Sequence, residues 1–328
     1  MNQSSKPVPN LVLMYHRVAE VEIDPWRLSV SPSQFDDQLD YLSHEMELVP
    51  LSDIHIASQT GRPKVAITFD DGYRDNFEFA FPSLERRGIP ATFFVVSRTV
   101  GEKREFWWDE LEHIVLNSVD LPSRVSLSST HGAFQHQLGS ATLYNFEQQQ
   151  LDREIEVFDA AVGTRLHFFR ELWDFLCGCP HDERETLLDE LWLWSGRNPV
   201  SRDSYIPMNA LELQAIDRSP LMEIGAHTVT HPRLPSLEGQ EKKVEILEGA
   251  KQLWSLTNRE PKAFSYPFGQ WDRESLEIVE SAFDYAVITK PKCITADTPR
   301  HRLNRFAVEN WSKDEFHSRI ALWSHQAD

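Results

Sequence analysis

The feature that most constrains the fold is an alternation of short apolar runs with longer segments of helical character. The apolar runs have the length of buried strands and lie at residues 11–14, 65–69, 91–96, 221–225, 263–266, 285–289 and 303–308. Helix-start or helix-stop signals follow several of them, such as Ser31-Pro32 and Gly88. This alternation implies parallel strands joined by helical crossovers, so we expect a doubly wound sheet or a barrel.

The alternation is interrupted between residues 99 and 203. This stretch is rich in tryptophan and in charged residues, and it contains long helical runs at 147–158 and 183–194. We therefore expect a first part of the strand–helix unit at 1–98, a mostly helical insertion or cap at 99–203, and a second part at 204–328.

Charge and terminal sequence narrow the functional class of this 328-residue chain. The formal net charge is −18, from 33 basic and 51 acidic residues, so most of the surface would repel a phosphate backbone and we expect no nucleic-acid partner. The polar start at 1–10 and the short apolar run after it predict neither a signal peptide nor a transmembrane segment. With only three cysteines, these features favour a cytoplasmic protein, whose oligomeric state stays open.

Two carboxylates stand side by side where the strand at 65–69 ends. They are Asp70 and Asp71, and Gly72 allows the backbone to turn sharply after them. The C-terminal ends of parallel strands share one rim, where α/β folds place their sites. An isolated turn of this kind is more often a solvated turn or a helix cap.

A histidine pair follows the strand at 221–225. His227 and His231 are four residues apart, but Pro232 disfavours helical backbone at His231. We place His227 at the strand end and His231 before a helix that begins with Pro232. Such a pair alone is more often structural, but with two aspartates on the same rim it predicts a metal site.

Together with the segment Ser265-Tyr266-Pro267-Phe268-Gly269, these residues resemble the motifs of the polysaccharide deacetylase family, also called NodB-homology or carbohydrate esterase family 4 proteins. The resemblance implies an α/β fold, a distorted (β/α)7 barrel of NodB-homology type with a mostly helical insertion. It also implies Zn²⁺, or another divalent metal such as Co²⁺ or Ni²⁺, held by Asp71, His227 and His231. The implied activity is removal of N-acetyl groups from an amino sugar, polysaccharide or glycoconjugate.

In this chemistry the ion polarises the amide and lowers the pKa of a water molecule, and Asp70 takes the proton of the water as general base. The resemblance makes the backbone N–H of Phe268 a candidate donor to the oxyanion. Tyr73, Trp107 and Trp108 are further candidates for substrate contact. The two tryptophans could instead anchor the helical insertion by packing.

Two departures from the family pattern matter. Ser265 stands where the family usually has an arginine that orients the base, and we expect Arg305 to supply that charge. The late leucine-x-histidine motif that supplies the general acid is missing, and His16 is our candidate because a closed barrel brings the first strand beside the last. The opening at 13–18 also resembles biofilm polysaccharide deacetylases whose motifs are circularly permuted.

Two alternatives stay open. Another N-acyl amidase, such as a deformylase, could use the same fold and the same residues. A catalytically inactive carbohydrate-binding protein could keep the barrel as a scaffold, although it would have no reason to retain a site that activates water.

Overall fold

The computed structural model describes residues 10–58 and 60–325, so most of the polar start of the chain lies outside the described residues. The chain forms two compact units: unit 1 comprises Met1–Glu20, Leu28–Gly101 and Pro207–Asp328, and unit 2 comprises Val21–Arg27 and Glu102–Ile206. Residues 21–27 lie within the predicted first part of the barrel, at 1–98, but their contacts group them with unit 2. Trp26 of this segment packs against Phe169 and Trp173, so the segment belongs to unit 2.

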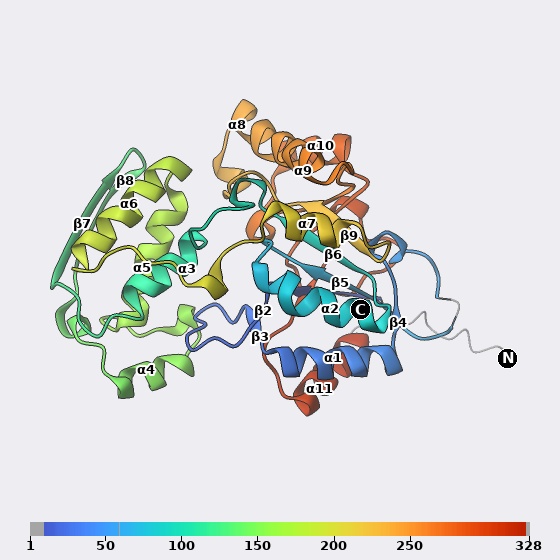
Figure 1. The fold of residues 1–328 in the computed structure, drawn as a ribbon, viewed down its shortest axis with the longest axis horizontal. Helices are drawn as coiled ribbons and strands as arrows, with labels where there is room; N and C mark the ends of the chain where they lie inside the picture. Colours follow the sequence, from blue (N-terminus) through green and yellow to red (C-terminus); the bar gives the residue numbers. More distant parts are fainter. Residues whose placement is uncertain (1–9, 59, 326–328) are drawn as a thin grey trace. The chain divides into compact units, whose positions relative to one another are not determined.

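Unit 1 is built on one sheet of parallel strands (Figure 1). The strand order is β11-β10-β9-β6-β5-β1-β12, and β4 pairs with β5 off this path. Their bounds are β1 (Leu11–Tyr15), β4 (Glu47–Leu48), β5 (Lys64–Phe69), β6 (Ala91–Val95), β9 (Met222–Ala226), β10 (Ala263–Ser265), β11 (Tyr285–Val287) and β12 (Phe306–Ala307). The short strands β2 (Arg17–Val18) and β3 (Ser29–Val30) pair separately. Each apolar run identified in the sequence contains one strand of the main sheet.

A single extended segment closes the sheet on itself. Leu303 forms a parallel bridge with Val287 of β11, and three residues later Phe306 pairs with Leu13 of β1. Arg305 lies between these two pairings, and its backbone N–H donates to the carbonyl of Lys290. The last strand segment therefore bridges the first strand and β11, as a barrel requires.

Helices surround the sheet (Figure 1). They are α1 (Pro32–Glu45), the π-helix η2 (Asn76–Ala80), α2 (Phe81–Arg87), α7 (Ala210–Asp217), α8 (Gly239–Lys243), the π-helix η8 (Val244–Glu248), α9 (Gly249–Thr257), α10 (Arg273–Ala282) and α11 (Lys313–His325). Ser31 caps α1 by accepting a hydrogen bond from the backbone N–H of Gln34, as predicted. Gly88 ends α2 in the left-handed conformation.

Alternate residues of the strands pack into two different hydrophobic cores of unit 1. Leu11, Leu13 and Tyr15 of β1 belong to the larger cluster that the helices cover. Val12, between them, belongs to a smaller cluster that also contains Ala66 of β5. Successive side chains point to opposite faces of a strand, so every second residue faces the barrel interior. This parity decides which side chains reach the site at the strand ends.

Unit 2 is mostly helical but also contains a β-hairpin that the sequence analysis misses. Its elements are α3 (Trp107–Val115), β7 (Arg124–Ser129), β8 (Gly132–Gln137), α4 (Phe146–Arg153), α5 (Arg165–Gly178) and α6 (His181–Trp194). β7 and β8 pair in antiparallel register through a tight turn. The alternation in β7 is short and partly serine, so it gives only a weak strand signal.

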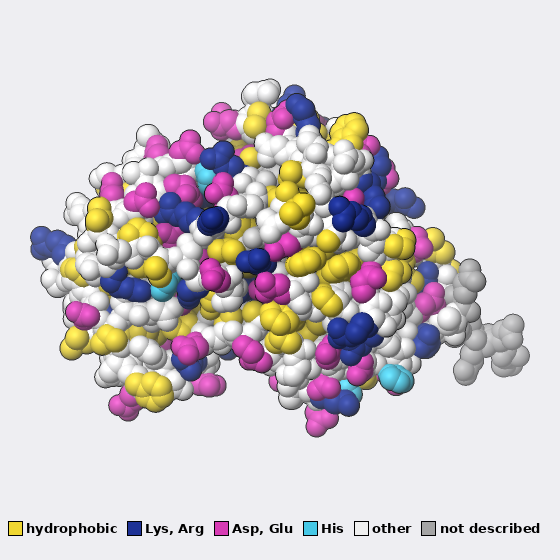
Figure 2. All heavy atoms as spheres, viewed as in Figure 1, with side chains coloured by type: hydrophobic (Ala, Val, Ile, Leu, Met, Phe, Trp, Pro, Cys, Tyr) yellow, Lys and Arg dark blue, Asp and Glu magenta, His cyan; other side chains and the backbone are white. Residues whose placement is uncertain are grey.

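The visible face of the molecule carries acidic and basic side chains intermixed (Figure 2). The acidic side chains are therefore spread over this face rather than gathered in one acidic patch. Among the described residues, every helix is too short or too polar to cross a membrane.

Candidate metal and catalytic site

The aspartate pair lies on a strained turn at the end of β5. Asp71 has a φ of 73°, in the left-handed region that non-glycine residues rarely adopt, and Gly72 follows with a φ of 90°. A Cβ atom on Gly72 would lie 2.9 Å from Cγ1 of Val95, so both the backbone angle and the space require glycine. Residues with strained backbone conformations are often found at functional sites.

The histidine pair lies on a second strained loop, after β9. Thr228 and His231 have φ angles of 65° and 57°, and the His231 backbone N–H donates to the Thr228 hydroxyl at 3.0 Å. The expected helix beginning at Pro232 is wrong. A 3-10 turn, η7 (Leu234–Ser236), comes first and α8 begins at Gly239, because the left-handed backbone of His231 cannot lead directly into a right-handed helix.

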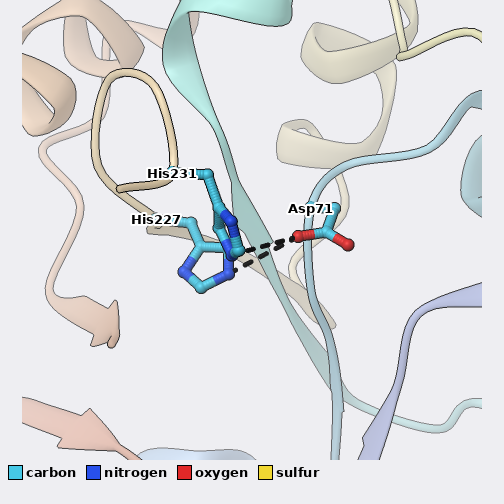
Figure 3. Close-up of side chains that lie close together, drawn as sticks. All are labelled: Asp71, His227 and His231. Carbon is cyan, nitrogen blue, oxygen red and sulfur yellow. Dashed lines mark ion pairs between the residues drawn. The ribbon is translucent and has the colours of Figure 1, made fainter. Parts of the chain in front are cut away.

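The turn and the loop bring three metal-ligand side chains together (Figure 3). Oδ1 of Asp71 lies 3.6 Å from Nε2 of His227 and 3.7 Å from Nε2 of His231. One ligand atom from each residue lies within 4.8 Å of the other two, and all three side chains are buried. Within the described part of the chain this is the single group of this kind.

The hydrogen bonding of His227 suits a metal ligand. Its Nδ1–H donates to the carbonyl oxygen of Ser265 at 2.7 Å, which leaves the Nε2 lone pair facing Asp71. Burial lowers the pKa of His227 against the opposing effect of Asp70, so the imidazole is neutral at neutral pH. Two imidazoles and one carboxylate form the donor set of many zinc sites, and these residues fit a divalent ion.

Asp70 lies beside this group, and its carboxylate is bound by Arg305, which lies near the C-terminal end of the sequence. Arg305 donates from its two terminal nitrogens to the two carboxylate oxygens, at 2.7 and 2.6 Å. The Ser265 hydroxyl donates to Oδ2 of Asp70 at 3.2 Å, and Arg305 also donates to the hydroxyls of Ser265 and Thr68. The carboxylate is therefore fixed in both position and orientation.

These contacts also set the charge of Asp70. Burial is the largest single influence and raises the pKa of the carboxyl. The charge and hydrogen bonds of Arg305, with the effects of His227 and His16, together lower the pKa by more than burial raises it. The net pKa lies well below the usual value for aspartate. Asp70 is thus ionised at neutral pH, as a general base must be.

His16 follows β1 and lies in the same electrostatic environment. Burial lowers the pKa of its imidazole to about 4, with Asp70 opposing the shift and Arg305 and His227 adding to it. The Asn76 amide donates to the His16 carbonyl at 2.8 Å and to Asp75, which also pairs with Arg17. Among the described residues the imidazole itself has no hydrogen-bond partner, so the backbone rather than the ring is tied to the structure.

Three predicted substrate contacts lie in packed surroundings. Tyr73 is fully buried, with the Arg17 guanidinium 4.7 Å from its ring centre. Trp107 and Trp108 are also buried in unit 2, where Trp107 stacks on Trp173 and Trp108 on Phe106. With these ring faces covered, the structure favours packing over sugar contact for all three.

Phe268 does lie at the site. It occupies the 3-10 turn η9 (Pro267–Gly269) with a φ of 57°, and its ring centre is 4.6 Å from that of His231. Its backbone N–H as an oxyanion donor stays a prediction. Of the six non-glycine residues with a positive φ in the described chain, four lie at this rim: Asp71, Thr228, His231 and Phe268.

Comparison with known proteins decides the family. The family model described as "Polysaccharide deacetylase" matches residues 57–171 and 200–286, which is more than half of the chain. The chain belongs to the polysaccharide deacetylase family. The matched ranges contain the aspartate pair, the histidine pair and the segment from Ser265 to Gly269, and they confirm the resemblance.

This polysaccharide deacetylase spans about half the length of the curated relatives that it matches. YxkH of Bacillus subtilis (strain 168), whose name assigns it to the same family, is 27% identical over 126 residues, covering 37% of this chain and 44% of YxkH. A poly-beta-1,6-N-acetyl-D-glucosamine N-deacetylase of Staphylococcus aureus is 26% identical over 170 residues, covering 46% of this chain and 55% of that protein.

Solved structures confirm the fold. IcaB from Ammonifex degensii superposes with a TM-score of 0.56 at 18% identity, covering 97% of each chain. The Streptococcus pyogenes deacetylase PplD, solved with acetate, gives a TM-score of 0.54 at 17% identity, covering 95% of this chain and 98% of PplD. The distorted (β/α)7 barrel expected from the sequence is thereby confirmed.

Two residues that shape the site are not among those predicted from the sequence. Ser265 is expected only as a departure from the family pattern, yet its carbonyl orients His227 and its hydroxyl contacts Asp70. Strand parity offers a signal for it, because Ala263 faces the barrel interior and Ser265 is two residues later. Asn76, which holds the backbone of His16, gives no comparable signal.

Proposed function

We propose that this polysaccharide deacetylase is a metal-dependent hydrolase that removes N-acetyl groups from an N-acetylated polysaccharide or glycoconjugate. The observation that carries the proposal is the placement of Asp70, ionised and held by Arg305, beside the ligand group of Asp71, His227 and His231. A divalent ion held by that group would polarise the amide carbonyl and lower the pKa of water.

The residues of the chain supply the proton transfers. Asp70 accepts a proton from the attacking water, and the two hydrogen bonds from Arg305 fix the orientation of its carboxylate. The leaving nitrogen must gain a proton because an amide anion is too basic to depart. We assign this step to His16. Its imidazole is neutral at rest, with a pKa of about 4, so it donates to the leaving nitrogen only after it has gained the proton that Asp70 removes from water.

The substrate class rests on relatives. The Staphylococcus aureus relative is named for a β-1,6-linked N-acetylglucosamine polymer, and that polymer is our first candidate substrate. A carbohydrate partner also agrees with the acidic surface, which would tolerate the amines formed as product.

An amine-release assay tests the proposal. Chelator-treated protein is supplied with Zn²⁺, Co²⁺ or Ni²⁺ and offered β-1,6- and β-1,4-linked N-acetylglucosamine oligomers, with N-formyl analogues in parallel. We expect amine and acetate to appear only after metal is added. Faster release of formate would favour the deformylase alternative. Oligomer binding without amine release under every condition would favour an inactive carbohydrate-binding protein.

A further inference from the structure

The loop that carries both histidine ligands holds an unfavourable backbone conformation. Thr228 and His231 are both left-handed, and this region is especially unfavourable for the β-branched Thr228. Contacts from outside the loop stabilise it. The backbone N–H groups of Ser97 and Arg98 donate to the carbonyls of Thr228 and Val229, each at 3.1 Å, and the N–H groups of the loop are bound by a side chain of the neighbouring helix.

Glu245 binds this loop through three hydrogen bonds. Its Oε2 accepts from the backbone N–H groups of Val229 and Thr230, each at 2.9 Å, and its Oε1 accepts from the Thr230 hydroxyl at 2.7 Å. The carboxylate thus satisfies donors in the segment that separates His227 from His231. Hydrogen bonds to an ionised acceptor are stronger than those between neutral groups.

The helix that carries Glu245 is shaped to approach the loop. Glu245 lies in the π-helix η8, and π-helical turns inside longer helices are frequent at functional sites. One turn later, a Cβ atom on Gly249 would lie 2.8 Å from the carbonyl carbon of Thr228, so glycine allows this close contact. Helix and loop are therefore fitted to each other at the backbone level.

We infer that Glu245 is a positioning residue that holds the 227–231 loop in the metal-binding conformation before the ion arrives. This inference rests on the proposed metal site and extends it to a residue that touches neither ligand. Without the carboxylate, two backbone N–H groups lose their acceptor and the left-handed turn can relax, which would move His231 away from Asp71. Outer contacts of this kind typically change metal affinity by about 10–100-fold.

The test compares three variants of the full chain. Zinc dissociation constants are measured by competition with a chromogenic chelator, and amide hydrogen exchange across 228–231 is measured on the metal-free protein. For Glu245→Ala we expect the zinc dissociation constant to rise about 10–100-fold and exchange to accelerate. Glu245→Gln should stay close to wild type, because its amide oxygen can accept both N–H groups and its NH₂ can donate to Thr230.

Glu248→Ala is the matched control on the same helix. Glu248 pairs with Lys251 at the surface, so its removal should change neither quantity. Wild-type zinc affinity together with wild-type exchange in Glu245→Ala would overturn the inference. If the wild-type protein bound no divalent ion, the proposed function would fail, while the exchange rates of the metal-free variants would still decide whether Glu245 holds the loop.

Discussion

Arg305 and Asp70 are 235 residues apart in the chain, yet the guanidinium contacts both carboxylate oxygens within 2.7 Å. Arg305 comes from the segment that closes the barrel, between its pairings with β11 and β1. The segment that closes the barrel therefore also carries the residue that orients Asp70, the proposed base. A buried pair of this kind is costly to break, because either partner alone leaves an uncompensated charge.

Two replacements of Arg305 should distinguish the effect of its positive charge from the effect of its paired hydrogen bonds to Asp70. Arg305→Ala leaves Asp70 buried without its partner, and we expect a loss of about 3–5 kcal/mol in the free energy of unfolding. Arg305→Lys keeps one charge but not the two-pronged contact, so it should fold and show a reduced kcat. Urea denaturation and amine-release kinetics measure both effects. Arg300→Lys, at an exposed position, is the control, and wild-type kcat in Arg305→Lys would contradict the orienting role.

Moving the arginine to the position where the family usually carries it offers a rescue test. Ser265 contacts both Arg305 and Asp70, so an arginine at 265 can reach the same carboxylate once residue 305 is small. We expect Ser265→Arg combined with Arg305→Ala to be more active and more stable than Arg305→Ala alone. An equal or lower kcat in the double variant would show that the charge must come from the barrel-closing strand.

His16 should matter for the leaving group rather than for the ion. We expect His16→Ala to keep its bound metal and its KM while kcat for the amide falls by about 10²–10⁴-fold. The loss should be smaller for an activated ester, whose leaving group needs no proton. His44→Ala, on the exposed face of α1, is the control. Equal losses for amide and ester would remove His16 from the acid role.

The tryptophans of α3 should affect stability rather than substrate binding. Trp107 is buried against Trp173 and Arg184, so Trp107→Ala should cost about 3–5 kcal/mol of unfolding free energy in unit 2 and leave KM nearly unchanged. Trp254→Ala removes a half-exposed tryptophan and should cost much less. A raised KM in folded Trp107→Ala with wild-type stability would restore the role of Trp107 in sugar contact.

Unit 2 should also lose stability as the pH rises. Burial raises the pKa of Glu112 to about 8, although its ion pair with Arg202 opposes this shift. Arg202 also donates hydrogen bonds to Glu105, so the two carboxylates share one positive charge. The unfolded chain releases the Glu112 proton near pH 4.5, hence folding becomes less favourable between about pH 4.5 and 8. Glu112→Gln should remove this dependence and raise the Tm at pH 8 relative to wild type.

Glu105→Gln is the matched control with the opposite sign. Burial raises the pKa of Glu105, but the nearby His113 and the hydrogen bonds and charge of Arg202 together lower it by more, so its charged form stabilises unit 2 at neutral pH. We expect this variant to lower the Tm at pH 8. Thermal melts from pH 5 to 8 measure both variants. A Tm difference between Glu112→Gln and wild type that does not change with pH would contradict the assignment.

The sequence predicts the strands and the ligand group because both follow from local patterns. Short apolar runs mark the barrel strands, and Asp71, His227 and His231 stand directly after two of them. The contact between Arg305 and Asp70 is predictable only through the resemblance, since no local signal links residues so far apart. Where the prediction fails, tertiary packing decides: Tyr73 is adjacent to the site in sequence, but its ring lies in the core against Arg17.

The backbone of the site is the part that sequence patterns describe least well. Pro232 indicates an irregular backbone at His231, but nothing in the sequence shows that Asp71, Thr228 and Phe268 also adopt left-handed conformations. Such conformations depend on long-range contacts, such as those of Glu245 with Val229 and Thr230. The division of the chain at residues 21–27 has the same origin, because Trp26 is placed by distant aromatic side chains.

The central claim is that Asp70 acts as base beside an ion held by Asp71, His227 and His231. The most direct test is amine release from an N-acetylglucosamine oligomer by wild type and Asp70→Asn, each stripped by chelator and titrated with Zn²⁺, with bound metal and secondary structure recorded in parallel. We predict that wild type gains activity up to one ion per chain, and that folded Asp70→Asn binds the ion but releases almost no amine. Full activity of the stripped wild type, or near-wild-type activity of Asp70→Asn, would contradict the account.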